Sequence, residues 1–255
     1  DQGDWEQLLH HLENGGQLAS TFGSAFGAAD AARLAGLLHD LGKFSEPFHA
    51  YIRGNGHSVD HSTAGARAIA EAATTATALP DRIVAELLAY GIAGHHAGLP
   101  DRGPAVGSTL TARLDKTATL IPPLTEASRS LEIPPAKHLL PNGFKIVTDR
   151  DGQPGFCLAT LGRMLFSCLV DADFIATESF YLSTKGSQAP RDWPALSARI
   201  DDMVAAFEAH MGAMRAALPE SRRIHPLNRL RGEVLAHVRA QAARPRGVFT
   251  LDVPT

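Results

Sequence analysis

Histidine and carboxylate side chains recur in small groups along the sequence, and one group interrupts a leucine-rich stretch. His39 and Asp40 are adjacent in "LAGLLHDLGKFSEPF", residues 34–48. An ionised carboxylate that is buried among apolar residues is costly unless it is paired or bound to a metal. Adjacent side chains on a helix diverge by about 100 degrees, so this pair can approach one cation from two sides. The two carboxylate oxygens can also bridge to a second cation, and the pair therefore predicts a metal site.

Other histidines and aspartates along the chain could complete such a site. They are His10 and His11 near the start, His61 in "SVDHST", His95 and His96 in "IAGHHAGLPD", and Asp171 and Asp173 in "LVDADFIATE". Nitrogen and oxygen ligands without thiolate suit manganese, iron, cobalt, nickel or zinc. The only cysteines, Cys157 and Cys168, have no CxxC spacing. Their spacing argues against a cysteine-based zinc site or a disulfide framework, and it fits a reducing cytoplasm.

A helix expected over 31–41 must present His39 and Asp40 to these partners. Its leucines recur at i, i+3, i+4 and i+7, which is a helical stripe. His39 and Asp40 fall on the opposite side, over Ala32 and Gly36, so we expect neither face to be exposed to water. The small residues would let a second helix approach closely, with His39 and Asp40 pointing into the gap.

The periodicity elsewhere predicts a mainly helical chain. We expect a first helix over 5–29 with a possible break at Gly15–Gly16, Asp30 as the N-cap of the next helix, and Gly42 at its end. A loop containing Pro47 should follow. Further helices are expected over 61–78, 82–94 after a Pro80–Asp81 cap, 156–181, 194–217 and 226–243.

Residues 98–155 are rich in proline. We expect short helices around 108–119 and 124–131, then an irregular segment with a small hairpin at "FKIVTDRDGQPGF". The final "GVFTLDVPT" predicts a short strand. No apolar run reaches the roughly 18 residues of a membrane helix. The acidic amino terminus lacks the basic start and apolar core of a signal peptide.

The motifs "ARLAGLLHDLGK", "VDHSTAGA", "AGHHAGLPD" and "DADFIATE", in this order, resemble the HD superfamily of metal-dependent phosphohydrolases. They more closely resemble the HD nuclease domain of the CRISPR-associated nuclease-helicase of type I systems, over about residues 5–245. The ending "VDADF…TE" hints at subtype I-C. The resemblance implies an all-α HD-domain helical bundle with a dinuclear metal site, an irregular Pro-rich insertion and a short C-terminal strand stub.

The resemblance also implies a domain division. The HD nuclease domain would cover 1–220, and 221–255 would be a linker helix with the truncated first strand of a helicase domain. "LDVPT" is similar to the strand that precedes a P-loop. We therefore expect an excised nuclease domain from a larger protein with an ATP-driven motor.

The resemblance assigns the ligands as follows. One metal would take His11, His39, Asp40 and a late aspartate, and the other would take Asp40, His61, His95 and His96, so that Asp40 bridges them. The family's "HL" pattern favours His11 over His10, and "ADFIAT" selects Asp173, although helical geometry alone does not separate it from Asp171.

Two further residues have open alternatives. Lys43 could act in catalysis by contacting a substrate phosphate oxygen, or it could simply interact with the negative end of the helix dipole. Ser62 could hydrogen-bond a ligand or phosphate, or it could be an ordinary first-turn residue. Together with Asp40, Lys43 is the expected catalytic residue.

The resemblance implies a metal-dependent endo- or exodeoxyribonuclease that degrades single-stranded DNA in antiviral defence. Two divalent ions (Mn, Fe, Co, Ni or Mg) would activate a water and stabilise the transition state, and ATP would serve only the absent helicase portion. The expected partners are single-stranded DNA, a guide-RNA surveillance complex of the Cascade type and the helicase domain of the parent chain, with no membrane and a cytoplasmic location. The formal net charge of −3 fits, because a protein that holds nucleic acid alone is usually basic.

Two other functions stay open. One is an HD-family nucleotidase or phosphodiesterase that acts on small nucleotides. The other is a non-enzymatic HD module that docks to a guide-RNA complex.

Overall fold

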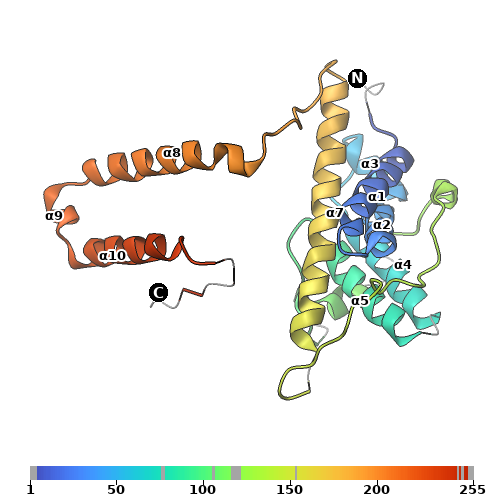
Figure 1. Cartoon of the computed structure of the whole chain (residues 1–255). Coiled ribbons are helices and arrows are strands. Elements are labelled where there is room, and N and C mark those ends of the chain that lie inside the picture. Colours follow the sequence, from blue (N-terminus) through green and yellow to red (C-terminus); the bar gives the residue numbers. More distant parts are fainter. Residues whose placement is uncertain are drawn as a thin grey trace. The chain divides into compact units, whose positions relative to one another are not determined.

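The computed structural model describes residues 5–75, 78–104, 107–115, 122–152, 154–245, 247 and 250–251, and these residues are mainly helical (Figure 1). Among them there is no strand, and a single isolated bridge joins Ser45 to Leu124. The predicted all-α fold is confirmed. The helices are α1 (Leu8–Ser24), α2 (Ala29–Leu38), α3 (Glu46–Ile52), α4 (Ser62–Thr75), α5 (Leu79–Gly94), α6 (Leu110–Leu114), α7 (Gly155–Ser183), α8 (Leu196–Ala216), α9 (Glu220–Arg223) and α10 (Pro226–Gln241), with 3-10 turns η2 (Leu41–Phe44) and η3 (Glu126–Ser130).

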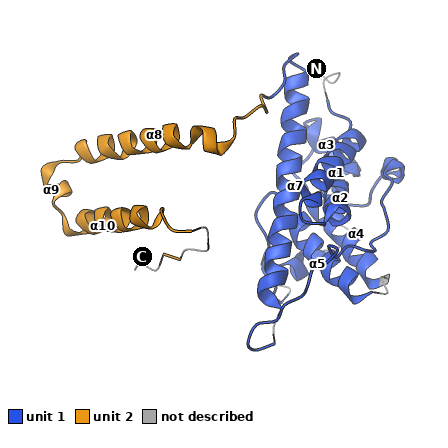
Figure 2. Ribbon diagram, viewed as in Figure 1, with its two compact units in different colours: residues 1–189 blue, residues 190–255 orange. Residues whose placement is uncertain are grey.

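The chain divides into two compact units, residues 1–189 and 190–255 (Figure 2). The predicted domains, 1–220 and 221–255, stay a prediction, and in the structure α8 lies in the same unit as α10. Glu208 of α8 forms an ion pair with Arg239 of α10, whose guanidinium lies 5.6 Å from the centre of the Phe207 ring. The functions that we predicted for the two parts stay predictions.

Helix α2 lies at the centre of the first unit. It contacts α1, α4, α5 and α7, and α7 also packs along α1 and α5 (Figure 1). From Ala31 to Leu38 every residue of α2 except Arg33 is buried. The prediction that neither face of this helix is exposed to water is confirmed.

Small residues bring α1 and α2 into close contact. A Cβ atom on Gly36 would lie 2.6 Å from the Gly16 Cα and 2.7 Å from the Gly15 carbonyl oxygen. The expected approach of a second helix onto the small-residue face is therefore confirmed. The possible break at Gly15–Gly16 is wrong, because α1 runs through both glycines without interruption and uses them as a contact surface.

The chain leaves the helix earlier than its sequence predicts. Helix α2 ends at Leu38, with His39 as the C-cap and Asp40 at φ −110° and ψ 19°. Gly42 does not end the helix. It lies in η2, where its N–H donates to the His61 carbonyl oxygen at 3.1 Å, and a Cβ atom at this position would lie 2.4 Å from that oxygen. Gly42 is thus required for close packing beside His61.

Three other expectations about the elements also need correction. Asp30 lies in the first turn of α2 instead of at its N-cap, where its charge still favours the positive end of the helix dipole. The segment expected as a loop forms α3, because Pro47 occupies the first turn, where proline is tolerated. Helix α6 and turn η3 are shorter than predicted, and residues 116–121 lie outside the described part of the chain.

The two predicted β elements have different outcomes. The hairpin at 144–156 is absent from the residues described there, 144–152 and 154–156. The predicted strand at 247–255 falls largely outside the described residues, which include only 247, 250 and 251 of it.

Helix α7 is long and apolar enough to cross a membrane, by length and composition only. The core helix of a soluble protein passes the same test. Here α7 packs against three helices of its own unit, and Asp173 within it faces a group of buried polar side chains.

Candidate metal centre

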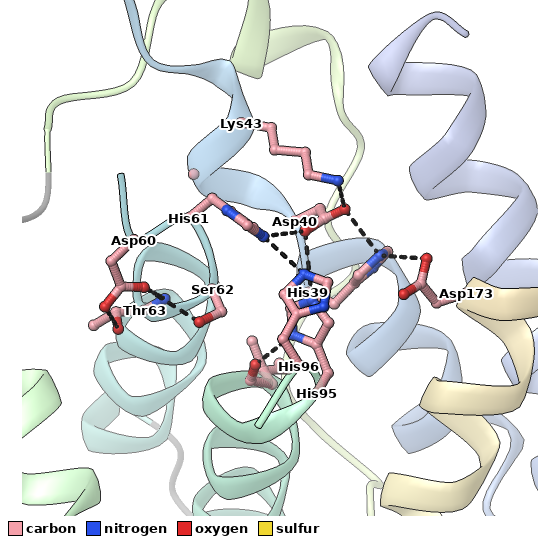
Figure 3. A network of polar contacts seen from close by, with 12 residues as sticks. His39, Asp40, Lys43, Asp60, His61, Ser62, Thr63, His95, His96 and Asp173 are labelled. Carbon is pink, nitrogen blue, oxygen red and sulfur yellow. Dashed lines mark hydrogen bonds and ion pairs between the residues drawn. The ribbon is translucent and has the colours of Figure 1, made fainter. Parts of the chain in front are cut away.

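Ligand-type side chains from separate helices converge into two adjoining groups (Figure 3). In each group, one ligand atom per residue lies within 4.8 Å of the others. These groups coincide with the two ligand sets that the family resemblance implied, and they share Asp40. The first cluster is His11, His39, Asp40 and Asp173, and the second cluster is Asp40, His61, His95 and His96.

The carboxylate of Asp40 faces both clusters. Its Oδ2 lies 3.6 Å from His11 Nε2 and 3.3 Å from His39 Nε2. Its Oδ1 lies 3.4 Å from His61 Nε2 and 3.5 Å from His95 Nε2. Because each oxygen serves a different cluster, the geometry is that of a bridging carboxylate.

Backbone carbonyls fix the orientation of the central histidine rings. His39 Nδ1 donates to the Gly36 carbonyl oxygen at 2.8 Å, and His95 Nδ1 donates to the Ile92 carbonyl oxygen at 2.7 Å. A carbonyl can only accept, so each neutral ring carries its proton on Nδ1. The lone pair of Nε2 then points toward Asp40, as a metal ligand requires.

Glu6 lies beside the histidine of the first helix. Its Oε2 lies 3.2 Å from His11 Nδ1, while His11 Nε2 faces the first cluster. This contact is an ion pair, because His11 Nδ1 makes no hydrogen bond among the described residues. Sequence analysis missed Glu6 because no motif includes it. The available signal was that Glu6 closely precedes a candidate metal-ligating histidine at the start of a helix.

The charges of the first cluster favour protonated histidine rings. Burial alone would lower the pKa of His11, but Asp173 and Asp40 outweigh it and raise the pKa to about 9. The same competition between burial and the two carboxylates raises the pKa of His39 to about 10. Burial would raise the pKa values of Asp40 and Asp173, but the neighbouring histidines hold both well below the usual range.

In the second cluster the pKa values of His61 and His96 are lowered instead of raised. Burial, together with the charge of His95, lowers the pKa of His96 to about 4. Burial also lowers the pKa of His61, against the attraction of Asp40. The Nε2 atoms of His61 and His96 lie 2.8 Å apart. Neutral rings of this kind can accept a cation without first losing a proton.

The residues present fit divalent metal ions. Asp40 is 1% exposed, and among the described residues neither carboxylate oxygen makes a hydrogen bond, although Lys43 forms an ion pair with Oδ2. His95 Nε2 is likewise buried without a hydrogen bond in that part of the chain. Buried polar atoms of this kind normally have a partner. The imidazole and carboxylate donors suit Mn, Fe, Co or Ni.

Lys43 lies at the outer side of the first cluster. It follows Asp40 by three residues, and its Nζ forms an ion pair with Asp40 Oδ2 (Figure 3). The ammonium group compensates one carboxylate oxygen where a cation would also bind. Lys43 also lies in the last turn of η2, so both roles that the sequence left open remain compatible with its position.

The structure places only one member of each ambiguous pair in a cluster. His10 has a side chain that is 71% exposed and lies 3.7 Å from Glu6, outside both clusters. Asp171 is exposed, whereas Asp173 Oδ1 lies 3.4 Å from His11 Nε2. Packing therefore selects His11 and Asp173, as the family pattern implied.

Ser62 belongs to a buried network that positions His61. Asp60 accepts hydrogen bonds from the Thr63 N–H at 3.1 Å and from the Thr63 hydroxyl at 2.7 Å, which closes the first turn of α4. Ser62 Oγ donates to Asp60 Oδ1 at 3.2 Å. These contacts give Ser62 a structural role, and its predicted contact with substrate stays a prediction. The capping role of Asp60 was missed because it depends on where the helix begins.

The all-α fold and the two histidine–aspartate clusters form a helical domain that could hold divalent metal ions. Residues 8–120 match the HD domain family, which supports placement in the HD superfamily. The matched segment contains every cluster residue except Asp173. A search of curated proteins found no match. HD domains bind divalent metals, and the match indicates metal-dependent hydrolase chemistry.

Proposed function

We propose that this chain is a nuclease domain that hydrolyses phosphodiester bonds in single-stranded DNA with the help of two divalent metal ions. The observation that carries the proposal is the pair of clusters that share the Asp40 carboxylate. Two divalent ions bound in such a pair supply an activated water and stabilise charge on the phosphate and the leaving oxygen.

The chain's own residues prepare the site for a phosphodiester. Asp40 remains ionised because its pKa is held low by the neighbouring histidines despite its burial. His39 and Asp40 are almost fully buried. Lys43, which forms an ion pair with Asp40, is one quarter exposed, and its ammonium group can pair with a phosphate oxygen when metal takes its place beside Asp40.

We further propose that the domain serves type I CRISPR interference, and the "VDADF…TE" motif favours subtype I-C. The substrate would be the strand that a guide-RNA surveillance complex displaces, and an ATP-driven helicase in the same parent chain would deliver it in the cytoplasm. The order of the four motifs supports this proposal. The net charge of −3 supports it too, because the partners would hold the DNA.

The test is metal-dependent cleavage by the purified full chain. A labelled single strand, the matching duplex and a nucleotide monophosphate are each incubated with Mn²⁺, and Asp40→Ala and chelator serve as controls. We expect the single strand to be degraded and both controls to be inactive. Hydrolysis of the monophosphate with an intact single strand would refute the proposal and favour a small-nucleotide hydrolase. Absence of bound metal and of all hydrolysis would favour a docking module.

A further inference from the structure

A cleft lined by aromatic side chains opens beside the first cluster. It has a volume of about 1000 Å³, and its lining includes His11 and Lys43. We call it the aromatic cleft, after Trp5, Phe48, Tyr51, Phe180 and Tyr181. Two of the chain's 3 tyrosines and one of its 2 tryptophans are gathered here, in a chain with only 6% aromatic residues.

Three rings of the aromatic cleft are open to solvent. Trp5 is 45% exposed, Tyr51 is 42% exposed and Tyr181 is 60% exposed. They come from three separate places: the segment before α1, helix α3 and the end of α7. Such large amphipathic side chains normally bury their faces against a partner when they gather in this way. The gathering therefore indicates a ligand with flat faces.

The aromatic cleft is lined by basic and acidic groups and adjoins the first cluster. Lys43 Nζ lies 5.8 Å from the centre of the Phe48 ring, and Arg53 and Glu6 also line the cleft. The Phe48 ring lies 5.5 Å from the ring of His61, in the second cluster, while His11 belongs to the first. A phosphate at the metal centre would therefore have aromatic rings and basic groups directly beside it.

We propose that the aromatic cleft binds the unpaired nucleotides next to the cleaved bond, with bases stacked on Tyr51 and Tyr181 and phosphates near Lys43 and Arg53. This inference rests on the proposed function. Every base has a π-face, so stacking on aromatic side chains holds a single strand regardless of its sequence.

The test compares two substrates that differ only in their bases. One is a single-stranded thymidine oligonucleotide, and the other has the same length and backbone but contains abasic residues. The full chain with Mn²⁺ is assayed as wild type, Tyr51→Ala, Tyr181→Ala and the double variant. Tyr51→Phe and Tyr181→Phe keep the ring, and Phe156→Ala is the matched control, since Phe156 is 86% exposed on α7 outside the cleft.

We expect wild type to prefer the thymidine strand in kcat/KM. Each alanine variant should lose about 5- to 150-fold on that strand and keep its rate on the abasic strand. The phenylalanine variants and Phe156→Ala should behave like wild type. Thermal melting should change little, because Tyr51 is 42% exposed and Tyr181 is 60% exposed.

Three outcomes would overturn the inference. Unchanged thymidine-strand cleavage in the double variant would show that the rings do not hold the bases. An equal loss on both strands would show that the tyrosines support the metal centre. A loss confined to hydrolysis of a nucleotide monophosphate would make the cleft a small-nucleotide site. A wild type that cleaves neither strand would instead refute the proposed function itself.

Discussion

The contact between α1 and α2 sets the distance between the two helices that hold His11 and His39, and Gly36→Ala would perturb it. The new Cβ atom would lie 2.6 Å from the Gly16 Cα and 2.7 Å from both the Gly16 nitrogen and the Gly15 oxygen. All three are backbone atoms, which cannot rotate away. Ordinary contact begins near 3.4 Å, so the helices must separate by about 0.8 Å.

Helix α1 should be the one that moves, because α2 is also held by α4, α5 and α7. Metal–ligand distances tolerate about 0.2 Å, so this shift should empty the first cluster. The second cluster should keep its ion, since its three histidines adjoin α4 and α5. The steric clash should also lower the free energy of unfolding by about 1–3 kcal/mol, partly offset by the better helix propensity of alanine.

The assay is metal content per chain after Mn²⁺ loading, together with urea unfolding of the metal-free chain. Wild type should hold two ions and Gly36→Ala should hold one. Gly91→Ala is the matched control, because a Cβ atom there would meet Phe166 at an ordinary 3.9 Å. If Gly36→Ala binds two ions with wild-type affinity, the α1–α2 contact does not set the first cluster.

Further predictions concern the shared and the ambiguous ligands and the protons of the first cluster. Asp40→Ala should lower the metal affinity of both clusters, whereas His61→Ala should mainly empty the second cluster. If both variants lose only the ion of the second cluster, Asp40 does not bridge the two ions. Asp173→Asn should weaken the first cluster while Asp171→Asn leaves metal content unchanged, and the reverse result would exchange their roles. The pKa of His39 is raised to about 10, so its contribution to stability is complete below its ordinary value of 6.5 and is lost as pH rises through about 10. Urea unfolding of the metal-free chain should therefore show falling stability from pH 6.5 to 9, and His39→Gln should flatten that slope; an equal slope in the variant would contradict the shifted pKa.

The helices of the first unit could be predicted because their apolar periodicity is a local property. The leucines of α2 recur at helical spacing, and the helix is buried on the sides that this pattern and its small residues predict. The end of α2 could not be predicted in the same way. The helix ends at Leu38 with His39 as its C-cap, Asp40 has non-helical φ and ψ, and Gly42 is required by its contact with His61.

The roles of the residues that support the site could not be predicted from the sequence, for a related reason. Glu6, Asp60 and Gly42 act through contacts with His11, the first turn of α4 and His61, respectively. Neither periodicity nor ligand chemistry distinguishes them from ordinary surface or turn residues. The aromatic cleft could not be predicted either, because its rings come from segments that are far apart in the sequence.

The sequence by itself determined the kinds of ligand and the helices that carry them, since donor chemistry belongs to the residue type and helical spacing to the local chain. Only the tertiary structure decided between His10 and His11, and between Asp171 and Asp173. Neighbouring side chains on a helix point in different directions, so the packing of α1 and α7 against α2 determines which one faces inward. The same packing gives each oxygen of Asp40 its own cluster.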